Sequence, residues 1–399
     1  MTKSIYVDQD VVGGSNNGTS KANAYNSSAG LQSALDDLAA PATENAFIYI
    51  YNSGASDEYT ITTELLQDSG GSVLSNSNDY WVKVVGCDSS GEPITVKGTR
   101  VKIRLTSSSG SVWTFTGGAE ISRVAYYNMW FHGGGNCANA FDCENDDVAL
   151  SHWYAWLNCE FSHATAYGLY TESDFRGTSA YDCYFHDNDI AGLFVAALGF
   201  MMVSCKAVSG SSGSYAIILS GARNYHFYDC IFDANGRSWA CFVFSFYLTT
   251  FINCVFRNAT VAAINAGAAA QFINCINCIV TVATPSADYG YLQELSTDGP
   301  AGLLLNNIST STIADGNFGD HDDLVKPYKT NGNNIDDSTG DYVDTTNYDW
   351  NNRTEANKGL INAMGQRSMI GVENVTPAET QAVSKTRRSL IGSPVDGSF

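Results

Sequence analysis

The chain has 399 residues, of which 44% are hydrophobic, and its 41 acidic residues outnumber its 21 basic residues to give a formal net charge of −20. This charge disfavours nucleic acid and anionic membrane surfaces as partners, because both attract proteins through basic side chains. The one basic cluster, residues 385–388, lies near the end of the chain and is expected to be a solvated tail.

The first 45 residues predict an N-terminal cap. A short strand at residues 5–8, a glycine-rich loop at 13–20 and a helix at 31–38 precede a second strand at 47–51. The end of a stack of strands needs such a cover, because open strand edges invite association. No apolar signal segment precedes the first strand, so we expect the chain to be made in a cytoplasm.

A short phrase recurs seven times between residues 127 and 277, and six of its copies carry a cysteine at the same place. The aligned positions are Met129, Cys159, Cys183, Cys205, Cys230, Cys254 and Cys275. The steps between the cysteines are 24, 22, 25, 24 and 21 residues, which is the length of one coil of a β-solenoid. The first step, of 30 residues, must hold an insertion.

Each phrase is followed by a second apolar run, so every repeat holds at least two short strands. Residues i and i+2 share one face of a strand, which places Cys183 and Phe185 on the same side. Stacking the coils predicts inward ladders of cysteine and phenylalanine. We expect the thiols to be reduced, because parallel partners about 4.8 Å apart match disulfide torsions poorly. We also expect them to bind no metal, since Cys275 and Cys278 form a lone C-x-x-C pair without a second pair at zinc-site spacing. The apolar stretches at 191–205 and 240–256 keep the register of the repeat, which favours buried strands over membrane insertion.

The coils are predicted to occupy residues 46–285, where the recurring cysteines stop. Residues 286–399 are then a loop-rich C-terminal cap or extended arm, since residues 315–353 are rich in Asn, Asp, Gly and Thr. Its few apolar anchors, such as residues 303–305, are expected to lie as a strap against a partner surface.

The repeated Asn/Asp-Cys-x-Phe phrase and the N-terminal pattern resemble the pectin-lyase-like superfamily over about residues 5–285. The resemblance implies an all-β fold: a right-handed, single-stranded parallel β-helix with an N-terminal capping helix. The superfamily includes polysaccharide lyases, glycoside hydrolases, phage tailspikes and adhesins, so the fold alone does not decide the function.

Polar residues follow the ladder strand at the turn of several coils. Those that we select as candidate binding residues are His132, His163, His186, Asp187, Asp233 and Arg257. Three histidines on successive coils could bind a shared ligand or a metal, or act in acid–base chemistry. Solvated polar turns explain the same row, and we predict no metal and no cofactor.

Candidate catalytic residues precede the Cys183 coil: Glu172, Asp174 and Arg176. Carboxylates on adjacent coils could stand at the separations that glycosidases use. Pectate-lyase-like members use an arginine base beside calcium-binding carboxylates. Arg176 near Asp174 and Glu172 is a weak match to that arrangement. The Gly-His-Gly turn of polygalacturonase-like members is represented only by the His132-Gly133 pair. Both comparisons favour a role without catalysis.

We therefore predict a bacteriophage virion structural protein, a β-helical spike, fibre or capsid decoration protein located in the virion. Its expected partners are other virion subunits and host polysaccharide, and the resemblance to phage proteins implies a homotrimer. The alternatives are a polysaccharide lyase or glycoside hydrolase of the β-helix type, and a bacterial surface adhesin.

Overall fold

The structure is a computed structural model, and the part of the chain that it describes comprises residues 3–37, 45–52, 58–68, 81–96, 98–107, 110–117, 123–145, 153–172, 177–197, 199–220, 224–246, 248–270, 272–276, 278–284, 289–293, 301–305, 308–309 and 335–336. Within these residues no helix is long and apolar enough to cross a membrane.

The described part of the chain contains three parallel sheets, with 11 strands in sheet A, 11 in sheet B and nine in sheet C. Sheet A contains β1 (Lys3–Val7), β2 (Ala46–Tyr51), β5 (Val82–Cys87), β8 (Arg123–Tyr127), β11 (Trp153–Leu157), β14 (Thr178–Tyr181), β17 (Phe200–Val203), β20 (Tyr225–Tyr228), β23 (Thr249–Ile252), β26 (Phe272–Ile276) and β29 (Ala301–Leu305). Sheet B contains β3 (Glu58–Ile61), β6 (Val101–Leu105), β9 (Met129–His132), β12 (Glu160–Ser162), β15 (Tyr184–His186), β18 (Lys206–Val208), β21 (Ile231–Asp233), β24 (Val255–Ala259), β27 (Ile279–Val282), β30 (Ile308–Ser309) and β31 (Ile335–Asp336). Sheet C contains β4 (Leu65–Asp68), β7 (Trp113–Gly117), β10 (Asn139–Asn145), β13 (Tyr167–Thr171), β16 (Ala191–Val195), β19 (Tyr215–Ser220), β22 (Trp239–Phe246), β25 (Ala262–Ala270) and β28 (Tyr289–Gln293).

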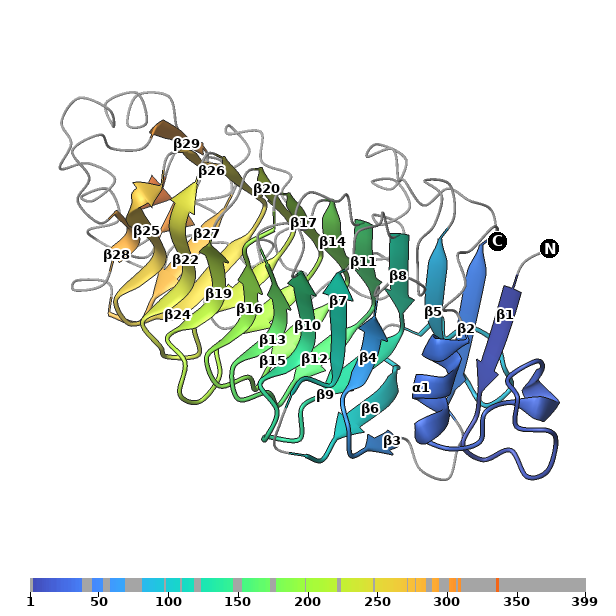
Figure 1. Cartoon of the computed structure of the whole chain (residues 1–399). Coiled ribbons are helices and arrows are strands. Elements are labelled where there is room, and N and C mark those ends of the chain that lie inside the picture. Colours follow the sequence, from blue (N-terminus) through green and yellow to red (C-terminus); the bar gives the residue numbers. More distant parts are fainter. Residues whose placement is uncertain are drawn as a thin grey trace, which may run out of the picture.

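Successive strands of the repeat belong to different sheets, and each strand pairs with the strand one coil later. For example, β11 pairs with β14, β12 with β15 and β13 with β16, all in parallel. Figure 1 shows these coils stacked in chain order along one axis, from the blue N-terminal end to the yellow and orange end. The predicted fold, a right-handed parallel β-helix with an N-terminal helix, is confirmed.

The N-terminal end combines strand pairing with a helix. Helix α1 (Ala29–Asp36) follows the short helix η1 (Lys21–Asn23), and it packs beside β1 and β4 (Figure 1). Leu31 and Leu35 are buried, as expected for residues four apart on one helix face. Gln32 accepts from the backbone N–H of Leu66 (3.0 Å) and donates to its carbonyl (2.9 Å). Since β1 pairs with β2, the proposed cap at residues 1–45 shares sheet A with the coils.

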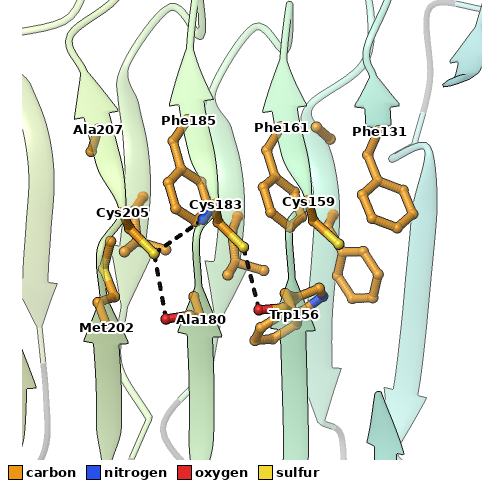
Figure 2. Packing of buried hydrophobic residues seen from close by; sticks show 14 of the residues in the cluster. Phe131, Trp156, Cys159, Phe161, Ala180, Cys183, Phe185, Met202, Cys205 and Ala207 are labelled. Atoms are coloured by element: carbon orange, nitrogen blue, oxygen red, sulfur yellow. Dashed lines mark hydrogen bonds between the residues drawn. The ribbon is translucent and has the colours of Figure 1, made fainter. Parts of the chain in front are cut away.

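The interior is built from the two predicted ladders. Phe131, Phe161 and Phe185 are in register on β9, β12 and β15, and their rings stack with centroids 5.3 and 4.8 Å apart. The cysteines lie beside them and donate to carbonyls of the preceding coil, as Cys205 Sγ does to Ala180 O at 3.4 Å (Figure 2). All 11 cysteines are buried free thiols, and the ladder cysteines from Cys159 to Cys254 belong to the main core, so the expected inward ladder is confirmed.

The last position of the cysteine ladder differs from the prediction. Val255 pairs with Ile279, so the residue that stacks on Cys254 is Cys278. Cys275 instead pairs with Phe251 on sheet A, where it is also buried. The sequence carries two overlapping phrases here, and only Cys278 keeps the 24-residue step from Cys254.

The residue before each ladder position explains why the phrase contains Asn or Asp. Six such residues form a one-residue turn between sheets A and B with φ between 53° and 59°: Asn128, Asn158, Asp182, Ser204, Asp229 and Asn253. This left-handed conformation is disfavoured for most side chains, and Asn and Asp tolerate it best among residues other than glycine. The turn side chains also bond from coil to coil, since Asn158 Nδ2 donates to Asn128 Oδ1 at 2.9 Å.

The sheets extend beyond residue 285, where the sequence placed the end of the coils. β28 pairs with β25, β29 with β26 and β30 with β27. Residues 303–305 are therefore part of a sheet A strand and are not anchors of a separate strap, which corrects the expectation for them. The boundary was misplaced because cysteine does not recur after Cys278. The arm expected at residues 337–399 lies outside the described residues.

A cysteine of the ladder gives a direct test of the interior. Burial raises the pKa of the Cys205 thiol well above its ordinary value, so it should be protonated and unreactive. We expect Cys205→Ser to lower the free energy of unfolding by about 1 to 3 kcal/mol, and Cys205→Ala by less, because serine buries a hydroxyl. Urea unfolding measures both values. Rapid labelling of every thiol in the native protein by a disulfide reagent would contradict the inward ladder.

Candidate functional site

The predicted histidine row lies on the outer face of sheet B, although its members do not occupy one column. His132 is in register with Ser162, and Ser162 with His186. His163 is one residue farther along, in a left-handed turn with φ of 59°. The three imidazoles still come together: the ring centroids of His132 and His163 are 4.2 Å apart, and those of His163 and His186 are 6.1 Å apart.

His132 and His163 form a stacked pair whose ring planes are 10° apart. His132 Nδ1 accepts from the N–H of Gly134 at 3.0 Å. Burial, together with the nearby His163, Lys102 and Arg104, lowers the pKa of His132 to about 4, and burial also lowers the pKa of His163. Both rings are therefore neutral at neutral pH.

Ser162 connects this pair to a tryptophan. Trp130 Nε1 donates to Ser162 Oγ at 2.8 Å, and Ser162 Oγ lies 2.9 Å from His163 Nδ1. A serine beside a histidine is the arrangement of an activated nucleophile. Ser162 is fully buried, however, so its hydroxyl orders the turn and is not accessible to a polymer substrate.

His186 is held by two carboxylates. Its Nε2 lies 2.9 Å from Glu160 Oε1, and its Nδ1 lies 2.6 Å from Asp187 Oδ2. Burial lowers the pKa of His186, but the hydrogen bonds to Glu160 and Asp187 outweigh it, so the pKa is raised. Arg100 pairs with the other oxygen of Glu160 at 2.5 Å. With both ring nitrogens engaged, this imidazole stabilises the turn and has no free nitrogen for acid–base catalysis.

The other two candidates of the row form a separate buried ion pair. Arg257 Nε lies 2.8 Å from Asp233 Oδ2, and Asn258 Nδ2 donates to the second carboxylate oxygen at 2.9 Å. They continue the same column, since Val208 pairs with Asp233 and Asp233 with Arg257. Val208 separates this pair from His186, so the six candidates form two groups. No cluster of three His, Cys, Asp or Glu side chains in the described part of the chain could hold a metal ion.

Of the three catalytic candidates, the structure describes only Glu172, which borders sheet C. Glu172 directly follows β13, and its N–H donates to the carbonyl of Cys143 at 3.2 Å. Asp174 and Arg176 lie outside the described residues. The Glu172, Asp174 and Arg176 group therefore stays a prediction.

The outer face of sheet C carries seven aromatic residues, which we call the aromatic platform. They lie on the neighbouring strands β13, β16, β19 and β22: Tyr167, Tyr170, Phe194, Tyr215, Trp239, Phe242 and Phe244. Phe194 points outward because its neighbours Leu193 and Val195 are buried, and Phe244 is 58% exposed. The aromatic platform was missed in the sequence because strands favour aromatic residues in any case.

The rings of the aromatic platform form two groups of contacting rings, one on β13 and β16 and one on β19 and β22, because Ile218 stands in register between Phe194 and Phe242. Tyr170 and Phe194 are 5.0 Å apart between centroids, with Tyr167 5.1 Å from Phe194. One coil farther, Tyr215 stacks on Trp239 at 5.0 Å, and Phe242 is 5.3 Å from Tyr215. A row of outward, half-buried rings over four coils offers an extended apolar surface of about 14 Å along the axis.

The stacked histidine pair predicts an acid-sensitive fold. The pKa of His132 is about 4 in the folded chain, against an ordinary value of 6.5. As pH falls from about 6.5 to 4, His132 becomes protonated in the unfolded chain but stays neutral in the folded chain. The free energy of unfolding therefore falls by at most about 3 kcal/mol. His132→Asn keeps an acceptor for the N–H of Gly134 and removes this titration. Urea unfolding at pH 7 and 4.5 should show a smaller loss in the variant, and an equal loss in both proteins would contradict the assignment.

Comparison with known proteins agrees with this fold. Residues 109–288 match the family model described as right handed beta helix region. The A-module of the mannuronan C-5 epimerase AlgE4 from Azotobacter vinelandii aligns with a TM-score of 0.53 at 13% identity, covering 77% of this chain and 89% of that module. ORF18 of Geobacillus virus E2 aligns with a TM-score of 0.48 at 14% identity, covering 77% of this chain and 60% of ORF18. A comparison with curated proteins finds no match.

A third similar structure is the tailspike gp49 of Acinetobacter baumannii bacteriophage Fri1, a capsular polysaccharide depolymerase. It aligns with a TM-score of 0.42 at 11% identity and covers 77% of this chain and 54% of the tailspike. The chain thus spans little more than half the length of the two phage proteins. The protein is a right-handed parallel β-helix protein, and identities this low establish its fold and not its activity.

Proposed function

We propose that the protein is a structural component of a bacteriophage particle, a β-helical spike, fibre or capsid-surface protein, that holds polysaccharide against sheet C. The aromatic platform is the observation that carries this proposal. The C–H bonds of a sugar ring are slightly positive and pack on the negative faces of aromatic rings, while the sugar hydroxyls stay in water. A row of rings on successive coils matches a polymer, which presents the same unit repeatedly.

The thiol interior supports assembly in a reducing compartment. All 11 cysteines are free, and thiols stay reduced in a cytoplasm, where phage proteins fold before they assemble. Within this proposal the chain associates with further copies, as a trimer, and with other virion subunits. Particles purified from a lysate of the source organism should contain the chain by mass spectrometry, and an antibody against it should label them in electron micrographs. Particles that lack the chain would contradict the virion role.

A second candidate function is cleavage of the bound polysaccharide. Glu172 favours it, because this carboxylate follows β13 only two residues after Tyr170 of the aromatic platform. Assays for reducing sugar and for unsaturated uronate over a polysaccharide panel would detect a hydrolase or a lyase. Activity that is lost in Glu172→Gln would replace the binding role by an enzymatic one.

A further inference from the structure

The outer face of sheet A carries an unbroken apolar column, which we call the sheet A stripe. Ten residues in register on the strands from β1 to β26 form it: Tyr6, Tyr49, Val85, Tyr127, Leu157, Tyr181, Val203, Tyr228, Ile252 and Ile276. They point outward because the residue before each of them belongs to the buried core. Nine are partly exposed, and Val85 is buried. Figure 1 shows these strands in one row along the axis, so the stripe is about 43 Å long at about 4.8 Å per coil.

The strands of sheet A differ from those of the other two sheets in charge. Within the described strands of sheet A there is no Asp or Glu, whereas sheet B contains Glu160 and sheet C contains Asp142. The basic side chains of sheet A lie on β1, β5 and β8, so its described strands from β11 to β29 carry no Lys, Arg, Asp or Glu. Two chains of net charge −20 repel each other least where their carboxylates do not meet. Of the three sheet faces, that of sheet A therefore suits the approach of a second copy best.

Polar turns border the sheet A stripe on one side. The one-residue turns between sheets A and B, such as Asn158, Ser204 and Asn253, directly follow residues of the stripe. Asp182 and Asp229 are acidic members of this row at the edge of the face, and Asp229 is buried and accepts from Asn253 Nδ2 at 3.2 Å. An apolar centre beside a polar rim is the usual anatomy of a protein–protein interface.

We infer that the sheet A stripe is the surface through which copies of this chain associate. The inference rests on the proposed association of copies and names the face that supplies it. A straight apolar stripe fits a partner with an equally straight apolar surface, which a second copy of the solenoid presents. With strands of four to six residues, the face is about 13 to 20 Å wide and roughly 600 to 900 Å² in area. A specific interface buries about 800 Å² per partner, so this face is large enough.

Charges placed on the sheet A stripe test the inference in the full chain. Leu157→Glu and Val203→Glu each change a partly exposed outward side chain, and burial of the new charge between copies should raise the dissociation constant at least about 100-fold. Val203→Lys should weaken association as well, because desolvation penalises either sign of charge. The matched control is Phe194→Glu, which makes the same kind of change on sheet C and should leave association unchanged. Sedimentation velocity over a dilution series measures the association, and circular dichroism checks that each variant keeps its β structure.

An introduced thiol tests the same face without adding a charge. All 11 native cysteines are buried, so a cysteine on an outer face reports on its own surroundings. In Val203→Cys we expect slow labelling by a maleimide while the copies are associated, and fast labelling after dilution to monomers. Phe194→Cys on sheet C should label at the same rate in both states.

The outcomes separate this inference from the proposed function. Association that persists in both Glu variants, with Val203→Cys labelled equally fast in associated and dilute protein, would overturn the inference and leave the association of copies standing. A wild-type chain that is monomeric at every concentration would contradict both. A monomer in which the thiol of Val203→Cys stays protected would show that another part of the same chain covers the sheet A stripe, and it would also overturn the inference. Polysaccharide binding and the presence of the chain in particles are independent of these results.

Discussion

Phe161→Ala should lower the free energy of unfolding by about 3 to 5 kcal/mol, the usual cost of truncating a fully buried phenylalanine. The ring of Phe161 is completely buried. It stacks between Phe131 at 5.3 Å and Phe185 at 4.8 Å, so the variant opens a cavity inside the ladder. Each coil contacts mainly its neighbours, which limits how far the structure can collapse into that cavity. Unfolding in urea, followed by tryptophan fluorescence, measures the loss.

Phe244→Ala is the matched control for that experiment. It makes the same chemical change on a side chain that is 58% exposed, and we expect a change in stability of less than about 1 kcal/mol. Similar losses in the two variants would show that the ladder does not carry the stability of the coils.

The fold was predictable from the sequence because every coil of a solenoid places similar residue types at the same positions. Each coil must bring the same small residue to the same inward corner, so a step of 22 to 25 residues between Cys159 and Cys254 fixes the coil length. The error at Cys275 arose where two copies of the phrase overlap, and only the pairing of Val255 with Ile279 decides between them. The last coil was missed because its strands carry no cysteine.

The candidate sites were less predictable, because they depend on register and on backbone conformation. Counting residues after the ladder places the three histidines in one row of polar turns, with His163 one position farther along its coil than His132 and His186. The left-handed conformation of His163 turns its ring onto His132. The aromatic platform depends on Tyr215 and Trp239 meeting across neighbouring strands, and these residues are 24 positions apart in the sequence. Spacing alone cannot distinguish rings that gather on an outer face from rings in the core.

Asp233→Ala should be the second strongly destabilising change, with a loss of about 3 to 5 kcal/mol, because it removes the carboxylate that pairs with the buried guanidinium of Arg257. Asp233 and Arg257 are 8% and 9% exposed, and the carboxylate also accepts from the backbone N–H of Asn235 at 2.9 Å. The double variant Asp233→Ala/Arg257→Leu removes both charges and should recover part of the loss. Urea unfolding of the two single variants and the double variant gives the coupling energy. If Asp233→Ala instead left stability unchanged and abolished polysaccharide binding, the pair would be a ligand site, as the sequence first indicated, and its role in holding the turns of sheet B together would be wrong.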